Sequence, residues 1–243
     1  MAISDYFIRY LEQRDLLTRE DRARLERIET TVHDFAPGET IIQRGQPETK
    51  SCLMLEGMSA RSHRINGRET DRVITALHVP GDFVDLHGFI LAGLEHSVVS
   101  VGASRVEFVS HAELTEITEN FPHLARLLWM STLIDAAIHR QWLVAAASLR
   151  SSAHLAHLLC EIYTRLTVVG VASGHQFTLP LLQRELADIL GYSPIHINRA
   201  VRDLRDRGLI RWSGSDVEIL DWPGLSGLAR FNPEYLDLEQ MRR

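Results

Sequence analysis

The sequence is poor in cysteine. Of its 243 residues only Cys52 and Cys160 are cysteines, and no CxxC pair is present. A disulfide framework needs more thiols at regular spacing, so none is expected, and a reducing cytoplasm is the predicted setting. In its apolar surroundings Cys52 is predicted to be buried and inert.

Long apolar runs are also missing. No stretch approaches the 18 or so apolar residues of a membrane helix, and the N-terminus lacks the charged and then apolar pattern of a signal peptide. The chain is therefore expected to be soluble and cytoplasmic, with no membrane partner.

An excess of positive charge is absent as well. The formal net charge is −6, which argues against binding nucleic acid through bulk charge. The charge is uneven, however, because residues 176–212 contain six arginines and four carboxylates, and the rest of the chain carries −8. This asymmetry predicts a basic DNA-reading region on an acidic body.

Residues 180–212 form the most informative stretch. The pattern predicts helices over about 182–190 and 194–207, joined by a tight turn at Gly191. Ser193 can cap the second helix, and Pro194 suits its first position, where no amide donor is needed. This is the pattern of a helix-turn-helix, although an ordinary helical hairpin in another kind of domain is the alternative.

A short hairpin follows at once, with strands at about 209–212 and 217–220 around Gly214. Together these parts predict a winged helix, whose second helix enters the major groove of DNA. The outer face of that helix is rich in arginine. The residues predicted to contact DNA are Ser193, His196, Asn198, Arg199, Arg202 and Arg211.

The first half of the chain has a different pattern of apolar residues and turns. Residues 4–30 look helical, whereas residues 31–110 contain short strand-like segments separated by glycine turns. Asn66-Gly67 is the strongest local hairpin signal. Short strands at this spacing predict an antiparallel β-barrel or sandwich.

A long helix is predicted to begin near Phe121. Alternating steps of three and four residues define one stripe along it, which we expect to form a dimer interface. The alternative is that the stripe packs on its own barrel. The stripe consists of Leu124, Leu127, Ser131, Ile134, Ile138, Gln141 and Ala145.

Beyond this helix, residues 152–169 and 225–230 are also predicted to be helical, and the tail from Asn232 is expected to be loosely held. The predicted fold class is α+β. Its parts are a sensor domain over residues 1–118, a dimerisation helix over 119–150 and a winged helix-turn-helix domain over 151–243.

The order of parts resembles the Crp–Fnr family of bacterial transcription regulators. The resemblance covers about residues 15–230 and is carried by residues 35–42, 80–83, 186–193, 196–199 and 204–210. It implies an N-terminal antiparallel β-roll similar to cyclic-nucleotide-binding domains, and a homodimer that binds double-stranded DNA under the control of a small signal. RNA polymerase is a further expected partner.

The predicted sensor pocket departs from the pattern of that family. Asp85-Leu86 stands where nucleotide binders have Gly-Glu, and His96-Ser97-Val98 stands where they have Arg-Ser-Ala. Leu86 cannot accept a ribose hydroxyl, and a neutral His96 lacks the bidentate fork that suits arginine to phosphate. Another small ligand, or none, is therefore expected in place of cyclic AMP. The predicted pocket residues are Gly81, Asp82, Phe83, Asp85, Leu86, His96 and Ser97.

No cofactor is expected to be required. The first thirty residues hold no cysteine, which excludes the iron–sulfur centre of the oxygen-sensing branch of the family. The alternative function is a cupin-like metal-dependent enzyme or sensor with a helical tail. Because no cupin-type histidine pair followed by glutamate occurs, no metal ligands or catalytic residues are predicted. The histidines within residues 31–110 are His33, His63, His78, His87 and His96.

Overall fold

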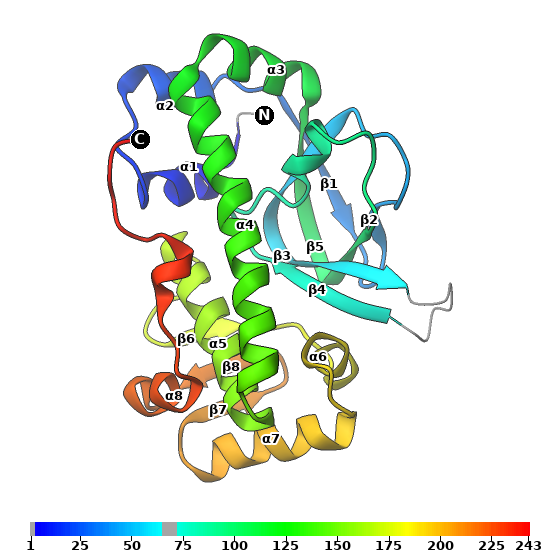
Figure 1. The fold of residues 1–243 in the computed structure, drawn as a ribbon, viewed down its shortest axis with the longest axis vertical. Coiled ribbons are helices and arrows are strands. Elements are labelled where there is room, and N and C mark those ends of the chain that lie inside the picture. The colour runs from blue at the N-terminus through cyan, green and yellow to red at the C-terminus, as the bar shows by residue number, and fades with distance from the viewer. Residues whose placement is uncertain (1–2, 65–71) are drawn as a thin grey trace.

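The protein consists of a β-sheet domain, a long helix and a helical domain with a small second sheet (Figure 1). The structure is a computed structural model and describes residues 3–64 and 72–243. The long helix α4 (Pro122–Ser148) runs nearly the full height of the molecule and connects the two domains. This is the predicted α+β architecture in the predicted order.

The N-terminal segment forms two short helices, α1 (Asp5–Glu12) and α2 (Arg19–Leu25), where one helical region was predicted. Both have side-chain caps. Ser4 accepts the Tyr6 amide hydrogen in α1, and Thr18 and Asp21 form a capping box in α2.

The N-terminal domain, which the sequence predicted to be a sensor domain, is built on one antiparallel sheet of five strands. The strand order is β1-β5-β3-β4, and β2 pairs with the other end of β5. Three cores of buried apolar side chains lie against this sheet and the helices. The strands are β1 (Thr30–Phe35), β2 (Thr40–Ile42), β3 (Lys50–Arg64), β4 (Arg72–His78) and β5 (Ser97–Ser110).

Strand β3 replaces two predicted strands. The sequence predicted a break near Gly57, but the strand continues through it with shifts in register against β5. Gly57 has a φ of 74°, and a Cβ atom there would lie 2.4 Å from the Ala103 carbonyl oxygen. The glycine therefore permits a bulge in a continuous strand. The predicted Asn66-Gly67 turn lies outside the described residues.

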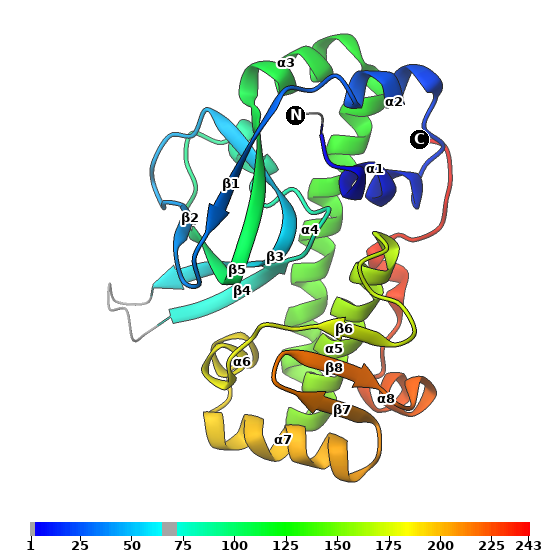
Figure 2. The ribbon, with the colours of Figure 1, turned by 180° about the vertical axis from the view of Figure 1, so that it is seen from behind.

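Helix α3 (His111–Asn120) follows the sheet and leads into α4. The start of α4 at Pro122 was predicted, since proline suits the first turn of a helix. Figures 1 and 2 show that the sheet and the N-terminal helices cover one side of α4 and leave the other uncovered.

The covered side of α4 is the stripe that the sequence assigned to a dimer interface. Its apolar members are buried inside the protomer. The stripe therefore packs within its own protomer, in line with the alternative to a dimer interface. The polar members are partly buried as well, and Gln141 Nε2 lies 3.3 Å from His157 Nε2 of the next helix. The buried apolar members are Leu124, Leu127, Ile134, Ile138 and Ala145.

The uncovered side of α4 carries a second apolar stripe. Trp129 is 66% exposed and Leu143 is 73% exposed. At 100° per residue, Trp129, Leu133 and Leu143 fall within one sector, which lies opposite the buried stripe. Val144 borders the same sector and is also exposed.

The C-terminal domain contains the predicted helices and hairpin. The small sheet has the order β6-β8-β7, and its first strand was not predicted. Helix α5 packs against both α7 and α8. The elements are α5 (Ser151–Val168), β6 (Gln176–Thr178), α6 (Gln183–Leu190), α7 (Pro194–Asp206), β7 (Ile210–Ser213), β8 (Asp216–Ile219) and α8 (Trp222–Ala229).

The prediction of a loosely held tail is wrong. After α8 the chain forms the short helix η2 (Pro233–Leu236), whose Leu236 is fully buried, and then runs beside α1 (Figure 1). The buried Arg14 side chain donates to the Leu236 carbonyl oxygen, and the Met241 amide donates to the Arg14 carbonyl oxygen. The tail thus ties the C-terminal domain to the N-terminal helices.

None of the helices within residues 3–64 and 72–243 combines the length and apolarity of a membrane span.

Candidate DNA-binding interface

The turn between α6 and α7 has the predicted geometry. Gly191 ends α6 in the left-handed conformation with a φ of 71°, which a residue without a Cβ adopts readily. Ser193 Oγ accepts the amide hydrogen of His196 and so caps α7. Its Oγ also lies 2.8 Å from His196 Nδ1, so the cap fixes the first polar side chain of the helix.

Helix α7 buries one face and exposes the other. Ile197, Ala200 and Leu204 are buried against α5 and α6, and Ala187 of α6 is small enough for a close crossing. Figure 2 shows α7 along the end of the molecule farthest from α3. All six residues predicted to contact DNA are exposed there or on the adjoining hairpin, namely Ser193, His196, Asn198, Arg199, Arg202 and Arg211.

The arginines of this region differ in how they are held. Arg207 pairs with Asp203 at 3.0 Å, and Arg211 pairs with Glu218 across the hairpin. Arg199 and Arg202 form no hydrogen bond or ion pair with any described residue. These two guanidinium groups are therefore available to an external partner without breaking an internal contact.

Two further exposed residues were not among the predicted contacts. Ile195, in the first turn of α7, is 64% exposed, and an apolar side chain at this position can contact a thymine methyl group. Arg184 lies exposed in the first turn of α6, the helix that crosses the DNA backbone in this motif. Their positions relative to the turn at Gly191 could have identified both.

The hairpin after α7 is held by its inner side chains. Trp212 and Val217 form a cross-strand pair and are buried, and Gly214 at the turn has a φ of 59°. Strand β6 pairs with β8 through Phe177 and Val217. The third strand braces the hairpin as a rigid wing beside α7.

The structure brings Asp82 and Phe83 of the predicted pocket residues together at one cavity beside Arg165, whereas the other five do not line it. Asp82 faces α5, where its Oδ2 lies 2.5 Å from Arg165. Asp85 points into the sheet and accepts the Cys52 amide hydrogen at 2.7 Å, and Leu86 packs in an apolar core. His96 contacts Glu95 and His63 instead.

Phe83 lines the same cavity as Asp82, whereas Gly81 and Ser97 do not. Phe83 packs edge-on against Phe7 of α1. A Cβ atom at Gly81 would lie 2.8 Å from a Val169 methyl group, so this glycine permits close packing of the two domains. Ser97 Oγ accepts the Arg44 amide hydrogen on another side of the sheet.

Arg61 crosses the interior of the sensor domain. Its guanidinium lies 3.0 Å from Asp135 and 2.8 Å from His139, both on α4. The Asp135 carboxylate neutralises this charge, and burial lowers the pKa of His96 to about 4, so His96 adds no charge at neutral pH.

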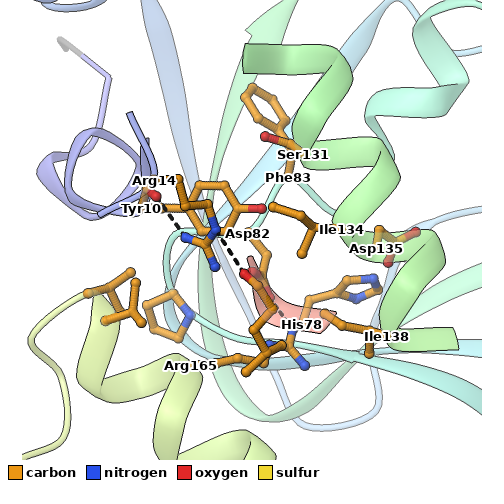
Figure 3. Close-up of a pocket in the computed structure, with 14 residues that line it drawn as sticks. Tyr10, Arg14, His78, Asp82, Phe83, Ser131, Ile134, Asp135, Ile138 and Arg165 are labelled. Atoms are coloured by element: carbon orange, nitrogen blue, oxygen red, sulfur yellow. Dashed lines mark hydrogen bonds and ion pairs between the residues drawn. The ribbon is translucent and has the colours of Figure 1, made fainter. Parts of the chain in front are cut away.

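A polar network joins the sensor domain to the DNA-reading domain at a cavity between α1, α4 and α5 (Figure 3). Arg165 of α5 lies at its centre, with Asp82 on one side and Glu161 at 3.0 Å on the other. Glu161 also accepts hydrogen bonds from Trp142 Nε1 of α4 and from the Tyr235 hydroxyl. One buried cluster therefore connects four parts of the chain.

The pKa values in this cluster follow from burial and pairing. Burial opposes the charge of Arg165, but the carboxylates of Asp82 and Glu161 more than offset this and raise its pKa. Burial raises the pKa of Glu161, and Arg165 only partly counters the rise. Arg165 therefore favours the charged form of Glu161, and the two carboxylates favour the charged form of Arg165.

A second ion pair joins the domains at their outer edge. Arg72 of β4 pairs with Asp188 of α6 at 3.0 Å. Through this pair, β4 contacts the first helix of the helix-turn-helix directly. A movement of β4 would therefore act on the position of α6.

Asp85 predicts a measurable pH dependence. Burial raises the pKa of its carboxyl group to about 7, although the hydrogen bond from Cys52 opposes the rise. A carboxyl group whose pKa is higher in the folded state stabilises the fold at low pH and loses that contribution as the pH rises. Relative to Asp85→Asn, the wild type should therefore lose free energy of unfolding between about pH 4 and pH 7. Urea unfolding across this range tests it, and a constant difference between the two proteins would contradict the assignment.

The comparison with protein families finds one domain. Residues 153–228 match the model of the Crp-like helix-turn-helix domain. The matched segment contains α6, α7 and the hairpin.

Among curated proteins, the chain is similar to several transcription regulators. It is 27% identical to the transcriptional regulatory protein btr of Bordetella pertussis over 155 residues, which cover 64% of each chain. It is 25% identical to the transcriptional activator FnrA of Stutzerimonas stutzeri over 218 residues, which cover 88% of this chain and 86% of that one.

Solved structures show the same fold. FixK2 from Bradyrhizobium japonicum superposes with a TM-score of 0.72 at 20% identity, over 83% of this chain and 98% of that one. A CooA variant from Carboxydothermus hydrogenoformans gives a TM-score of 0.61 at 13% identity, over 82% of this chain and 88% of that one.

Proposed function

The chain is a transcriptional regulator of the Crp–Fnr family, and from this premise we propose that two copies form a homodimer that reads a near-palindromic operator with α7. The observation that carries the proposal is the outward face of α7, where Arg199 and Arg202 are exposed and unpaired among the described residues. A small ligand other than cyclic AMP controls the reading, and RNA polymerase is the partner at the promoter.

The uncovered stripe of α4 supports the homodimer. Trp129, Leu133 and Leu143 leave apolar surface exposed along one helical face, and such a face is stabilised when a second copy covers it. Steps of four and three residues run through 129, 133, 136, 140, 143 and 147, which is the spacing of a two-stranded coiled coil. The proposed dimer interface therefore lies on the face of α4 opposite the stripe that the sequence predicted.

The residues of α7 have separate roles in this proposal. Arg199 and His196 contact base edges, Asn198 joins them, and Arg202 contacts a base or a phosphate. Ser193 and Arg211 contact the sugar-phosphate backbone of the DNA. Base contacts specify the operator, whereas phosphate contacts position the protein.

The sensor domain supports a ligand other than cyclic AMP. Leu86 is buried in an apolar core, and His96 is uncharged at neutral pH, so neither supplies the ribose or phosphate contact that the family pattern places there. The guanidinium of Arg61 is already paired with Asp135.

The experiment is the selection of genomic DNA fragments by the purified full-length protein, with and without a panel of metabolites that includes cyclic AMP. A shared near-palindrome in the selected fragments is expected. Equal retention of all fragments at moderate salt would contradict the proposal.

Arg199→Ala should weaken binding to the selected operator by about 1–3 kcal/mol and relax the preference at one base position. The reason is the loss of a guanidinium contact to a base edge. Affinity is measured by fluorescence anisotropy on the operator and on random DNA. Arg207→Ala is the matched control, because Arg207 is exposed but paired with Asp203. An equal loss on both DNAs would reduce Arg199 to a phosphate contact.

A further inference from the structure

Three histidines that are distant in the sequence meet in the sensor domain. The ring of His96 lies 5.6 Å from the ring of His63 of β3 and 5.4 Å from the ring of His87. Glu95 Oε1 lies 3.1 Å from His96 Nδ1. One possible ligand atom each from His63, Glu95 and His96 lies within 4.8 Å of the other two.

His96 Nδ1 and Glu95 Oε1 lie next to each other in this group. The ionised Glu95 carboxylate can only accept a hydrogen bond, so in the metal-free protein His96 Nδ1 carries the hydrogen between them. A metal ion would take the place of this hydrogen, and the imidazole hydrogen would then reside on Nε2. Nε2 lies on the other side of the ring and has no hydrogen-bond partner among the described residues.

We propose that His63, Glu95 and His96 bind one divalent first-row transition-metal ion of the Zn²⁺ type. Two imidazoles and one carboxylate suit Zn²⁺ and its neighbours, whereas Mg²⁺ and Ca²⁺ prefer oxygen ligands alone. Bonds of about 2.0 Å in a tetrahedral site bring ligand atoms to roughly 3.3 Å, so the three must approach one another. Glu95 is exposed, which leaves its side chain free to move and opens the site to solvent. His63 is half-buried, and its Nε2 lies 3.0 Å from the Thr75 hydroxyl oxygen, which leaves Nδ1 for the ion.

Nearby positive charges do not prevent metal binding at this site. Arg61 and Arg44 lie close enough to affect His63, but Arg61 is paired with Asp135 of α4 and Glu95 adds a negative charge at the site itself. The proposal does not depend on DNA binding, because metal binding is measured on the protein alone.

The test is titration of the metal-free full-length protein with Zn²⁺ by calorimetry and with Co²⁺ by visible absorption. One ion per chain is expected, with a d–d spectrum for Co²⁺ and no displacement by excess Mg²⁺. Glu95→Gln and His63→Gln should each weaken binding at least about tenfold. His33→Gln is the matched control, because His33 is exposed on β1, and it should bind as the wild type does.

Glu95→Gln is the decisive variant because its side chain is exposed, and circular dichroism can verify that it folds. Wild-type affinity in both Glu95→Gln and His63→Gln would overturn the proposal, since the ion would then be bound elsewhere. The absence of stoichiometric Zn²⁺ binding would overturn it as well.

Discussion

Replacing Arg165 by alanine is expected to lower the free energy of unfolding by about 3–5 kcal/mol. The substitution leaves Glu161, which is fully buried, without its cationic partner, and it removes the hydrogen bond to the Leu77 carbonyl oxygen. Urea unfolding monitored by tryptophan fluorescence measures the loss. Arg207→Ala is the control, and its exposed pair with Asp203 should contribute less than about 1 kcal/mol.

The loss in Arg165→Ala should also depend on pH. Without Arg165, burial holds the pKa of Glu161 further above its unfolded value, so the folded variant is more stable when this carboxyl group is protonated. The defect should therefore be smaller at pH 5 than at pH 8. A loss below about 1 kcal/mol at both pH values would show that the network does not stabilise the fold.

The second large effect concerns the uncovered stripe of α4. Leu143→Glu should place a charge from each protomer in the dimer interface at a cost of about 3 kcal/mol or more, and so raise the dimer dissociation constant more than about 100-fold. Leu143 is exposed within the protomer, so the variant should remain folded. Sedimentation velocity over a range of concentrations measures the change.

The control for this variant is Leu16→Glu. Leu16 is also an exposed leucine but lies between α1 and α2, away from α4. It should leave the dimer intact. If Leu143→Glu remained dimeric at the same protein concentrations as the wild type, the interface would lie elsewhere.

The helix-turn-helix could be predicted from the sequence because its signals are local. The Ser193 cap, the Gly191 turn and the spacing of Ile197 and Leu204 all act within a few residues. Such signals determine both the helices and the face that they expose, so the predicted contact residues lie on the outer surface.

The covered face of α4 could not be predicted in the same way. Both stripes have apolar residues at steps of three and four, and the spacing does not tell which one a neighbouring domain covers. Leu127 and Ile134 are buried because the sheet domain and the N-terminal helices pack there. That choice depends on long-range contacts, as does the docking of the tail through Leu236.

The candidate metal site also could not be predicted from local sequence patterns. His63, His87 and His96 meet only because β3, β5 and the intervening segment are brought together by the register of the sheet. The predicted pocket residues separated for the same reason, since Asp82 and Asp85 face different parts of the interior.

The central claim is that a pair of protomers presents two copies of α7 to successive turns of one face of DNA. Hydroxyl-radical footprinting of a selected operator tests it most directly. Two protected half-sites related by a two-fold axis are expected, with centres roughly 34 Å or about 10 base pairs apart. Protection of one unrepeated half-site by a single protomer would contradict it.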